Sequence, residues 1–328
     1  MIILSCGKSG EEPASNWDKF SYQEYPSIHK NLVVWQDNRN GNWDIFLYDI
    51  NTGKETQLTS DPSDQTEPKI YGNYVVWLDN RHGDNTAAIY LFDITSFSER
   101  VISKETANNP DYESYDYSDL SICGRYVAWI RHVHGQKPRF DVILYDIDEG
   151  LLLNLTENED GKLKGRPVVF SNTVCWTYGS YIVCYNIDTG QKTLFDMAPI
   201  NIGRLDVYKN TIALEGNTNG NTDIYLFNLS NEQLLQLTTE PHGQENPHIY
   251  GSIVVWEDKR FTDNPLELGN IGMLDLNKME EKIIDKSEYA QFSPDIWGNY
   301  IVWTDFREWS DIYLYNISTG GVKRISPI

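Results

Sequence analysis

The chain repeats one phrase, which is most complete in PKIYGNYVVWLDNR at residues 68–81. The tryptophan of this phrase recurs at intervals of 38–52 residues, with one leucine in its place. These positions are Trp35, Trp77, Trp129, Trp176, Leu214, Trp256 and Trp303. Because self-similarity at such a period is the signature of a repeat architecture, we take seven repeats as the organising feature of the chain.

Each repeat contains four short strand-like pieces. In the first repeat they cover residues 26–29, 32–36, 44–49 and 55–59. Their alternating pattern and their Gly, Asn and Asp punctuation indicate antiparallel strands, and no stretch has a sustained helical period. Small sheets bury both faces when they pack side by side in a ring. The sequence therefore predicts an all-β fold, a seven-bladed β-propeller of four-stranded blades over residues 23–328. We expect each repeat to form one blade, so that no blade is shared where the first and last repeats meet. The alternative is that residues 17–22 add one strand at this seam.

The composition limits the classes of partner. The formal net charge is −21. This charge argues against nucleic acids and anionic membrane surfaces, because proteins bind both through basic patches. An acidic surface usually serves solubility; a basic partner or bound Ca²⁺ is the alternative.

The first 22 residues are expected to form a tail. Residues 2–7, IILSCG, resemble the end of a bacterial lipoprotein signal, with Cys6 as the residue that would carry the lipid. A full signal has a charged start and a longer apolar run, so either the start is truncated or the match is accidental. The polar segment 8–16 suits a tether. We expect export to the cell surface, the periplasm or the medium, with membrane contact only through Cys6.

The fourth repeat contains two cysteines within VCWTYGSYIVC. A two-residue turn at Gly179-Ser180 places Cys175 opposite Cys184 in a non-hydrogen-bonded pair, where side chains approach closely. The sequence favours a disulfide between them, which fits an oxidising compartment. The alternative is two reduced cysteines in a β-hairpin. Cys123 has no evident partner.

Four repeats contain an Asp-x-Arg motif. The pairs are Asp37 and Arg39, Asp79 and Arg81, Asp258 and Arg260, and Asp305 and Arg307. Recurrence in several blades favours a structural role, in which charge-assisted hydrogen bonds cap a hairpin and link blades. A Ca²⁺ loop is the weaker alternative, because an arginine stands where such a loop needs an oxygen ligand.

The repeat phrase resembles the TolB-like propeller family, in the variety found in microbial cell-surface and exported proteins. The resemblance rests on residues 68–81, on DIFLYD at 44–49, and on the Thr-Gly turn at 52–53 that leads into QLT at 57–59. It covers residues 23–328 and implies the propeller fold. TolB itself has six such blades and an additional N-terminal domain, so its partner contacts do not transfer to this chain.

A search for catalytic motifs finds no Gly-x-Ser-x-Gly elbow, phosphate loop or zinc-type spacing. The weak metal-ligand candidates are His82, His132, His134 and His242, in loops expected on one face. Oligogalacturonate lyases resemble this architecture and hold a metal on a propeller with histidines and a glutamine. The corresponding glutamines would be Gln23, Gln65, Gln244 and Gln291. Each precedes a proline by three residues within the repeat, and this regularity favours a structural role.

The main functional prediction is a non-catalytic binding or scaffolding module, with the metal-dependent lyase as the alternative. Differences between repeats concentrate in residues 106–119, 132–140 and 261–270, and loops on one face of a rigid scaffold commonly carry binding residues. The expected anchors are Tyr112, Tyr115 and Tyr117, in one long loop between blades, and Trp43 and Trp309, at equivalent places just before the third strand. The alternative for the two tryptophans is a role as blade caps. Tyrosines mixed with carboxylates suit a carbohydrate or a basic protein partner.

Overall fold

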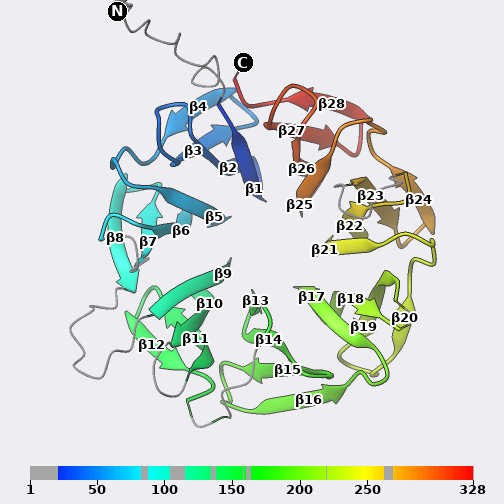
Figure 1. Cartoon of the computed structure of the whole chain (residues 1–328). Coiled ribbons are helices and arrows are strands. Elements are labelled where there is room, and N and C mark those ends of the chain that lie inside the picture. The colour runs from blue at the N-terminus through cyan, green and yellow to red at the C-terminus, as the bar shows by residue number, and fades with distance from the viewer. Residues whose placement is uncertain are drawn as a thin grey trace, which may run out of the picture.

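The computed structural model describes residues 21–82, 88–103, 115–133, 138–157, 159, 164–218, 220–261 and 269–327, with the backbone alone for residues 115–118. Seven four-stranded antiparallel sheets form a ring (Figure 1), and their inner strands line a central channel. Each blade is one stretch of chain, which confirms the predicted seven-bladed propeller. Within the described part there is no helix with the length and apolar character of a membrane span.

The strands follow the repeats. Blade 1 contains β1 (Gln23–His29), β2 (Leu32–Asp37), β3 (Asp44–Asp49) and β4 (Lys54–Gln57). Blade 2 contains β5 (Gln65–Tyr71), β6 (Tyr74–Asp79), β7 (Ala88–Asp93) and β8 (Ser98–Ser103). Blade 3 contains β9 (Tyr115–Cys123), β10 (Tyr126–Val133), β11 (Arg139–Asp146) and β12 (Leu151–Asn154). Blade 4 contains β13 (Val168–Phe170), β14 (Thr173–Tyr178), β15 (Tyr181–Asn186) and β16 (Lys192–Asp196).

The remaining three blades repeat the pattern. Blade 5 contains β17 (Asn201–Tyr208), β18 (Thr211–Asn217), β19 (Thr222–Asn228) and β20 (Leu234–Gln236). Blade 6 contains β21 (Gln244–Tyr250), β22 (Ile253–Asp258), β23 (Asn270–Asp275) and β24 (Glu280–Ile283). Blade 7 contains β25 (Gln291–Trp297), β26 (Tyr300–Asp305), β27 (Asp311–Asn316) and β28 (Gly321–Arg324). In every blade the first strand lies nearest the channel (Figure 1).

The repeated tryptophans form the core between blades. All six are fully buried, and Leu214 is 1% exposed in the seventh place. Trp77 of blade 2, for example, packs with Val34 and Ile45 of blade 1. Each indole is thus shared by two neighbouring sheets, and removal of this large apolar surface from water stabilises the ring.

The ring closes between blades 7 and 1 without a shared blade, as predicted. The amide of Gln23 donates to the carbonyl of Ser310 at 2.9 Å, and the amide of Ile28 donates to Asp295 Oδ2 at 2.9 Å. The same type of bond joins the covalently connected blades 1 and 2, where Gln65 N donates to Trp43 O at 2.7 Å. The seam therefore resembles any other blade boundary.

Blades 1, 2, 6 and 7 contain a Trp–Asp–Arg clasp, formed by the Asp-x-Arg motif and the repeated tryptophan. In blade 2, Trp77 Nε1 donates to Asp79 at 2.9 Å, and Arg81 N and Nε donate to the same carboxylate at 3.0 and 2.8 Å. Arg81 also pairs with Glu99 of the outer strand at 2.6 Å. Since Asp79 is fully buried, the motif fastens the second strand to the fourth and has the structural role predicted for it.

The clasp also acts on carboxyl pKa values and on neighbouring blades. Burial alone would raise the pKa of Asp305, but hydrogen bonds from Arg307, Trp303 and Gln291 lower it overall. Arg307 pairs in addition with Asp285, which follows the last strand of blade 6. The carboxylate is therefore held ionised inside the protein by charge-assisted hydrogen bonds.

Candidate functional site in the central channel

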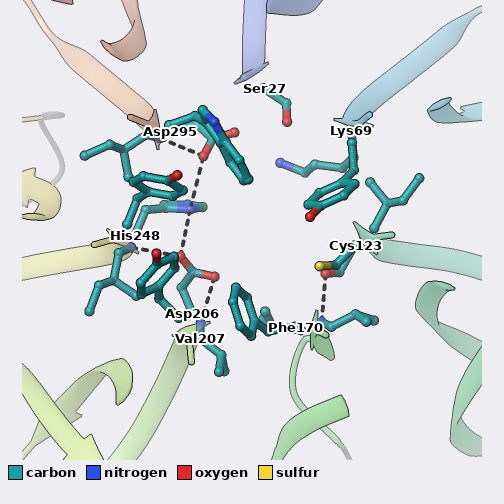
Figure 2. Close-up of a pocket in the computed structure, with 18 of the residues that line it drawn as sticks. Ser27, Lys69, Cys123, Phe170, Asp206, Val207, His248 and Asp295 are labelled. Carbon is teal, nitrogen blue, oxygen red and sulfur yellow. Dashed lines mark hydrogen bonds and ion pairs between the residues drawn. The ribbon is translucent and has the colours of Figure 1, made fainter. Parts of the chain in front are cut away.

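Three layers of side chains line the channel, because positions two apart on a strand face the same way. The mouth layer consists of Tyr25, Glu67, Asp119, Arg166, Arg204, Asn246 and Ser293. The middle layer consists of Ser27, Lys69, Ser121, Val168, Asp206, His248 and Asp295. The floor layer consists of His29, Tyr71, Cys123, Phe170, Tyr208, Tyr250 and Trp297. Residues from all three layers line one cavity of about 140 Å³ (Figure 2).

Irregularities in the inner strands orient these layers. Between the mouth and middle layers the first hairpin has a β-bulge in six blades, for example between Thr66 and Lys69. The mouth residue Glu67 has a φ of 52°, and Tyr25 a φ of 54°. Bulges bend a strand and re-aim its side chains, often beside a functional site. Here they turn the residue after the repeat proline toward the channel.

The floor layer is almost a closed ring of aromatic groups. Neighbouring rings in the arc from Phe170 through Trp297 to Tyr71 have centroids 4.1–5.3 Å apart. Tyr71 and Trp297, from blades on either side of His29, also contact each other at 5.7 Å. Cys123 fills the seventh place. The floor therefore narrows the channel at the face where the first and second strands are joined by turns.

Burial keeps the floor uncharged. It lowers the pKa of His29 to about 4, with a smaller contribution from Lys30. The neutral imidazole accepts a hydrogen bond at Nδ1 from Gly72 N at 3.0 Å. Burial, followed by the effect of Cys123, raises the pKa of Tyr71 to about 12. At neutral pH the floor is thus an uncharged, largely apolar surface of aromatic rings that are tilted relative to one another.

In the middle layer, side-chain oxygens accept hydrogen bonds from the next blade. Asp206 accepts from Ile249 N at 2.8 Å, and Ser121 accepts from Val169 N at 3.0 Å. At the seam, Asp295 accepts from Ile28 N in the same manner. These bonds hold the side chains in fixed positions, so the middle layer is a rigid set of polar groups.

Asp206, His248 and Asp295 form a cluster on one side of the channel (Figure 2). His248 Nδ1 lies 3.7 Å from Asp206 Oδ2 and 3.8 Å from Asp295 Oδ1. Burial raises the pKa of Asp206 to about 7 and raises that of Asp295. Burial, and then the nearby cations beginning with Lys69, lowers the pKa of His248 well below its usual value. The histidine is neutral at pH 7, and both contacts are longer than a normal hydrogen bond.

Three cationic side chains from blades 2, 4 and 5 line the same cavity. Among the described residues, Lys69 Nζ makes no hydrogen bond or ion pair, and neither does the guanidinium of the exposed Arg204. Arg166 makes one side-chain hydrogen bond within the described chain, from Nε to Asp119 Oδ1 at 2.9 Å. Burial lowers the pKa of Lys69, and Arg166 acts in the same direction. In the part of the chain that the structure describes, Lys69 and Arg204 therefore lack the anionic partner that Arg166 has in Asp119.

Sequence reasoning missed the middle layer, although a signal was present. The residue after the repeat proline differs from blade to blade, as Lys69, His248 and Asp295 illustrate, whereas the floor position is aromatic in six blades if His29 is included. Variation at one position of an otherwise regular repeat marks a residue that the fold does not require.

The histidine candidates lie apart from this site. His82 Nε2 is 2.9 Å from Tyr90 Oη, and His242 is exposed between blades 5 and 6. His132 was expected in a loop but lies on β10, because this strand extends to Val133. His134 lies outside the described residues. Across the described residues, no group of three His, Cys, Asp or Glu side chains is placed to hold a metal ion.

The tryptophan anchors are not equivalent to each other, contrary to expectation. Trp43 directly precedes β3, whereas Trp309 stands two residues before β27. The loop between the second and third strands is one residue shorter in blade 7 than in blade 1. The carbonyl of Trp43, which accepts a hydrogen bond from the next blade, therefore corresponds to the carbonyl of Ser310. Trp309 is 46% exposed and has a φ of 119°, which is rare for a non-glycine residue.

The tyrosine anchors were assigned to one loop, and this is wrong for two of them. Tyr115 and Tyr117 belong to β9, the inner strand of blade 3, where they pair with Val133 and Arg131. Tyr112 lies outside the described residues. The strand begins earlier than predicted because β9 and β10 are longer than their counterparts in other blades.

Cys175 and Cys184 face each other in the predicted register and are joined by a disulfide in the structure. Their Cα atoms are 4.2 Å apart. Cys123 is a buried free cysteine whose sulfur accepts from Ser171 N at 3.4 Å. The disulfide lies within blade 4, so it crosslinks two strands of one sheet and does not join blades.

No family model and no curated protein matches the chain. Solved structures of similar fold include the β-propeller domain of the Trilobed protease from Pyrococcus furiosus, described as having an open velcro topology. That domain is 12% identical with a TM-score of 0.73, and the match covers 94% of this chain and 96% of that one.

Two other similar structures contain or form enzymes. An oligogalacturonate lyase in complex with manganese is 13% identical with a TM-score of 0.65, over 90% of this chain and 89% of that one. The acylaminoacyl peptidase of Pyrococcus horikoshii is 12% identical with a TM-score of 0.71, and the match covers 95% of this chain but 53% of the peptidase. At these identities the likeness to peptidase and lyase propellers establishes the β-propeller fold alone.

Proposed function

We propose that this chain is an exported, non-catalytic binding propeller that takes part of a protein or carbohydrate partner into the mouth of its central channel. One observation carries the proposal. The middle layer holds five different residue types in seven blades and projects charged groups such as Lys69 and Asp295 into a cavity, while the surrounding repeat stays regular. A rigid concave site with a few fixed polar groups is typical of ligand binding.

The polar groups of the cavity support binding without chemistry. The oxygens of Asp206 accept backbone amides from both β17 and β21, and His248 stands beyond hydrogen-bond distance of both carboxylates. Asp206 is thus engaged in holding blades 5 and 6 together. A lyase on the pattern of the metal-dependent relatives would need its histidines in one place, and His82, His132 and His242 belong to three separate regions of the described chain.

A partner would enter from the mouth side of the channel, where the loops between second and third strands and between blades lie. The floor layer narrows the opposite end, whereas the mouth layer exposes Tyr25 to 41%. Trp309 is on the same face, in the loop that follows β26, and offers a large ring at low conformational cost.

The test is a screen of protein and glycan ligands against the protein and a channel-blocked variant. Val168→Trp fills the channel at the middle layer, and Thr52→Trp places the same side chain on the exposed turn of the opposite face as a control. We expect ligands to bind the parent and Thr52→Trp proteins equally and to bind Val168→Trp at least tenfold more weakly. Ligands that bind the blocked variant unchanged would contradict the proposal, as would recovery of a chemically altered ligand.

A further inference from the structure

The cavity has a charge balance opposite to that of the chain. Its lining contains three basic residues, Lys69, Arg166 and Arg204, and two acidic ones, Asp206 and Asp295. The whole chain contains 27 basic and 48 acidic residues. Relative to the whole chain, basic side chains are therefore enriched in the lining of this cavity, while Glu67 and Asp119 lie in the mouth layer. Such enrichment focuses the electrostatic potential on anions.

The acidic residues of the cavity are already occupied. Asp206 accepts amides from Val207 and Ile249, and Asp295 accepts amides from Ile296 and Ile28. Both stand on the His248 side of the channel, and Lys69 stands on the other side (Figure 2).

The basic residues, by contrast, have unused donors. The ammonium of Lys69 has three N–H groups and no protein acceptor among the described residues, and the Arg204 guanidinium has no acceptor there either. Arg166 uses only Nε, on Asp119. Burial and the charge of Arg166 disfavour the ammonium of Lys69 despite the carboxylates in the channel, so an anion bound directly to Lys69 would lower the free energy of the site.

The floor adds an apolar contact surface below these charges. Tyr71, Phe170, Tyr208, Tyr250 and Trp297 all line the same cavity. Aromatic faces and edges pack well against another planar ring. A buried cavity of roughly 150 Å³ holds one benzene ring, and the volume here is about 140 Å³.

We propose that the channel binds a carboxylate carried on one ring-sized apolar group, with the anion held by Lys69 and Arg204 and the ring lying toward the aromatic floor. This inference rests on the proposed function, because it names the chemical group that enters the channel. Two sources have this chemistry: a free aromatic acid, and the C-terminal aromatic residue of a polypeptide.

The experiment is calorimetric titration with matched probes. Phenylacetate should bind saturably at millimolar concentration, whereas neutral phenylacetamide and ring-free acetate should bind at least tenfold more weakly. The tripeptide Ala-Ala-Tyr, with a free or an amidated C-terminus, reports on the second source. Binding of the free peptide alone would identify a polypeptide terminus, and binding of phenylacetate alone would identify a free acid.

Variants locate the binding. Lys69→Met keeps the apolar stem and removes the charge, and it should weaken binding of the acid probes at least tenfold. Arg204→Met changes an exposed residue and gives the same test if Lys69→Met fails to fold. Lys54→Met, on the exposed β4, should bind as the parent does. Tyr250→Leu should lower the affinity for phenylacetate more than the affinity for acetate.

The outcomes separate this inference from the proposed function. If the amide probes bind as tightly as the acids, or if both charge variants bind normally, the anion site is wrong even when the channel-blocked variant loses its ligand. If neither acid probe binds at millimolar concentration, the inference is also overturned. Loss of acid binding in Val168→Trp, Lys69→Met and Arg204→Met together would support both proposals.

Discussion

Blades 1, 2, 6 and 7 have the Trp–Asp–Arg clasp, and blades 3, 4 and 5 do not. In blade 3 an arginine, Arg131, takes the place of the aspartate and pairs with Asp141 at 2.8 Å. In blade 4 the buried Trp176 Nε1 has no hydrogen-bond partner among the described residues, and this blade contains the disulfide. Blade 5 replaces the tryptophan by Leu214, which needs no acceptor.

The missing clasp of blade 5 has a steric cause. Gly216 occupies the aspartate position, and a Cβ atom there would meet Ile200 at 2.6 Å and Tyr225 at 2.7 Å. The comparison shows that the aspartate position accepts a polar lock in four blades, Tyr178 in blade 4 and simple packing around Gly216 in blade 5. The fold requires a filled site between blades and does not require one particular chemistry.

The largest expected effect comes from breaking a clasp. Asp79→Ala leaves Arg81 and Trp77 Nε1 without their buried acceptor, and loss of one partner of a buried ion pair costs about 3–5 kcal/mol. Urea unfolding should show this decrease in stability. Glu99→Ala is the matched control, because Glu99 pairs with the same arginine at the surface and should cost less than about 1 kcal/mol. If Asp79→Ala and Glu99→Ala lower the free energy of unfolding equally, the structural role of the clasp is contradicted.

The next effect concerns the disulfide of blade 4. A crosslink that closes a loop of about ten residues stabilises by roughly 2–3 kcal/mol in the chain-entropy model. Complete reduction should lower the unfolding free energy of the parent by about this amount. The double variant Cys175→Ala and Cys184→Ala should be insensitive to the reductant. A parent protein unaffected by reduction would show that the hairpin is held by its other contacts.

In blade 5, Asp206 makes stability depend on pH. Its pKa is raised by burial to about 7. The pKa of this carboxyl in the unfolded chain is near 4, so between about pH 4 and pH 7 the native state binds one more proton than the unfolded state. The free energy of unfolding therefore falls as the pH rises through this window. Asp206→Asn removes the titration, and its stability relative to the parent should increase by on the order of 1 kcal/mol from pH 6 to pH 8. Asp148→Asn, in an exposed turn, is the control and should keep a constant difference from the parent in unfolding free energy. If the difference between Asp206→Asn and the parent is also independent of pH, Asp206 is not the group responsible.

The smallest effect compares turns in the two sets of blades. The turn between the first and second strands starts with a left-handed residue in every blade, Gly72 in blade 2 and Lys209 in blade 5, with φ values of 62° and 55°. Lys209→Gly should therefore stabilise by about 0.5 kcal/mol, and Gly72→Ala should destabilise by about 1 kcal/mol. No atom lies within 4 Å of a Cβ on Gly72, so thermal unfolding would report the backbone alone.

The fold could be predicted from the sequence because its evidence is local and repeated. Each copy of the phrase at residues 68–81 brings its own turn, its buried tryptophan and its alternating strands. The register of the cysteine hairpin could be predicted by counting outward from the turn at Gly179-Ser180. A two-residue turn fixes the pairing of the two strands and therefore places Cys175 opposite Cys184.

The site could not be predicted in the same way. Which inner-strand residues line the channel depends on bulges, such as the one after Thr66, and the repeat pattern does not reveal these. Histidines in loops are conspicuous as ligand candidates, whereas a single lysine in a strand, such as Lys69, resembles a surface residue. The wrong equivalence of Trp43 and Trp309 arose from a loop one residue shorter.

The seam between blades 7 and 1 has a consequence for the linear order of the chain. Gln23 N and Ser310 O form across the seam the bond that Gln65 N and Trp43 O form between consecutive blades. Ring order is cyclic, and the peptide connection between any two blades is interchangeable with the non-covalent contact at the seam. A circularly permuted chain that starts at blade 2 and joins blade 7 to blade 1 through a short linker would keep the same neighbours in space, with a different pair of blades free to separate first.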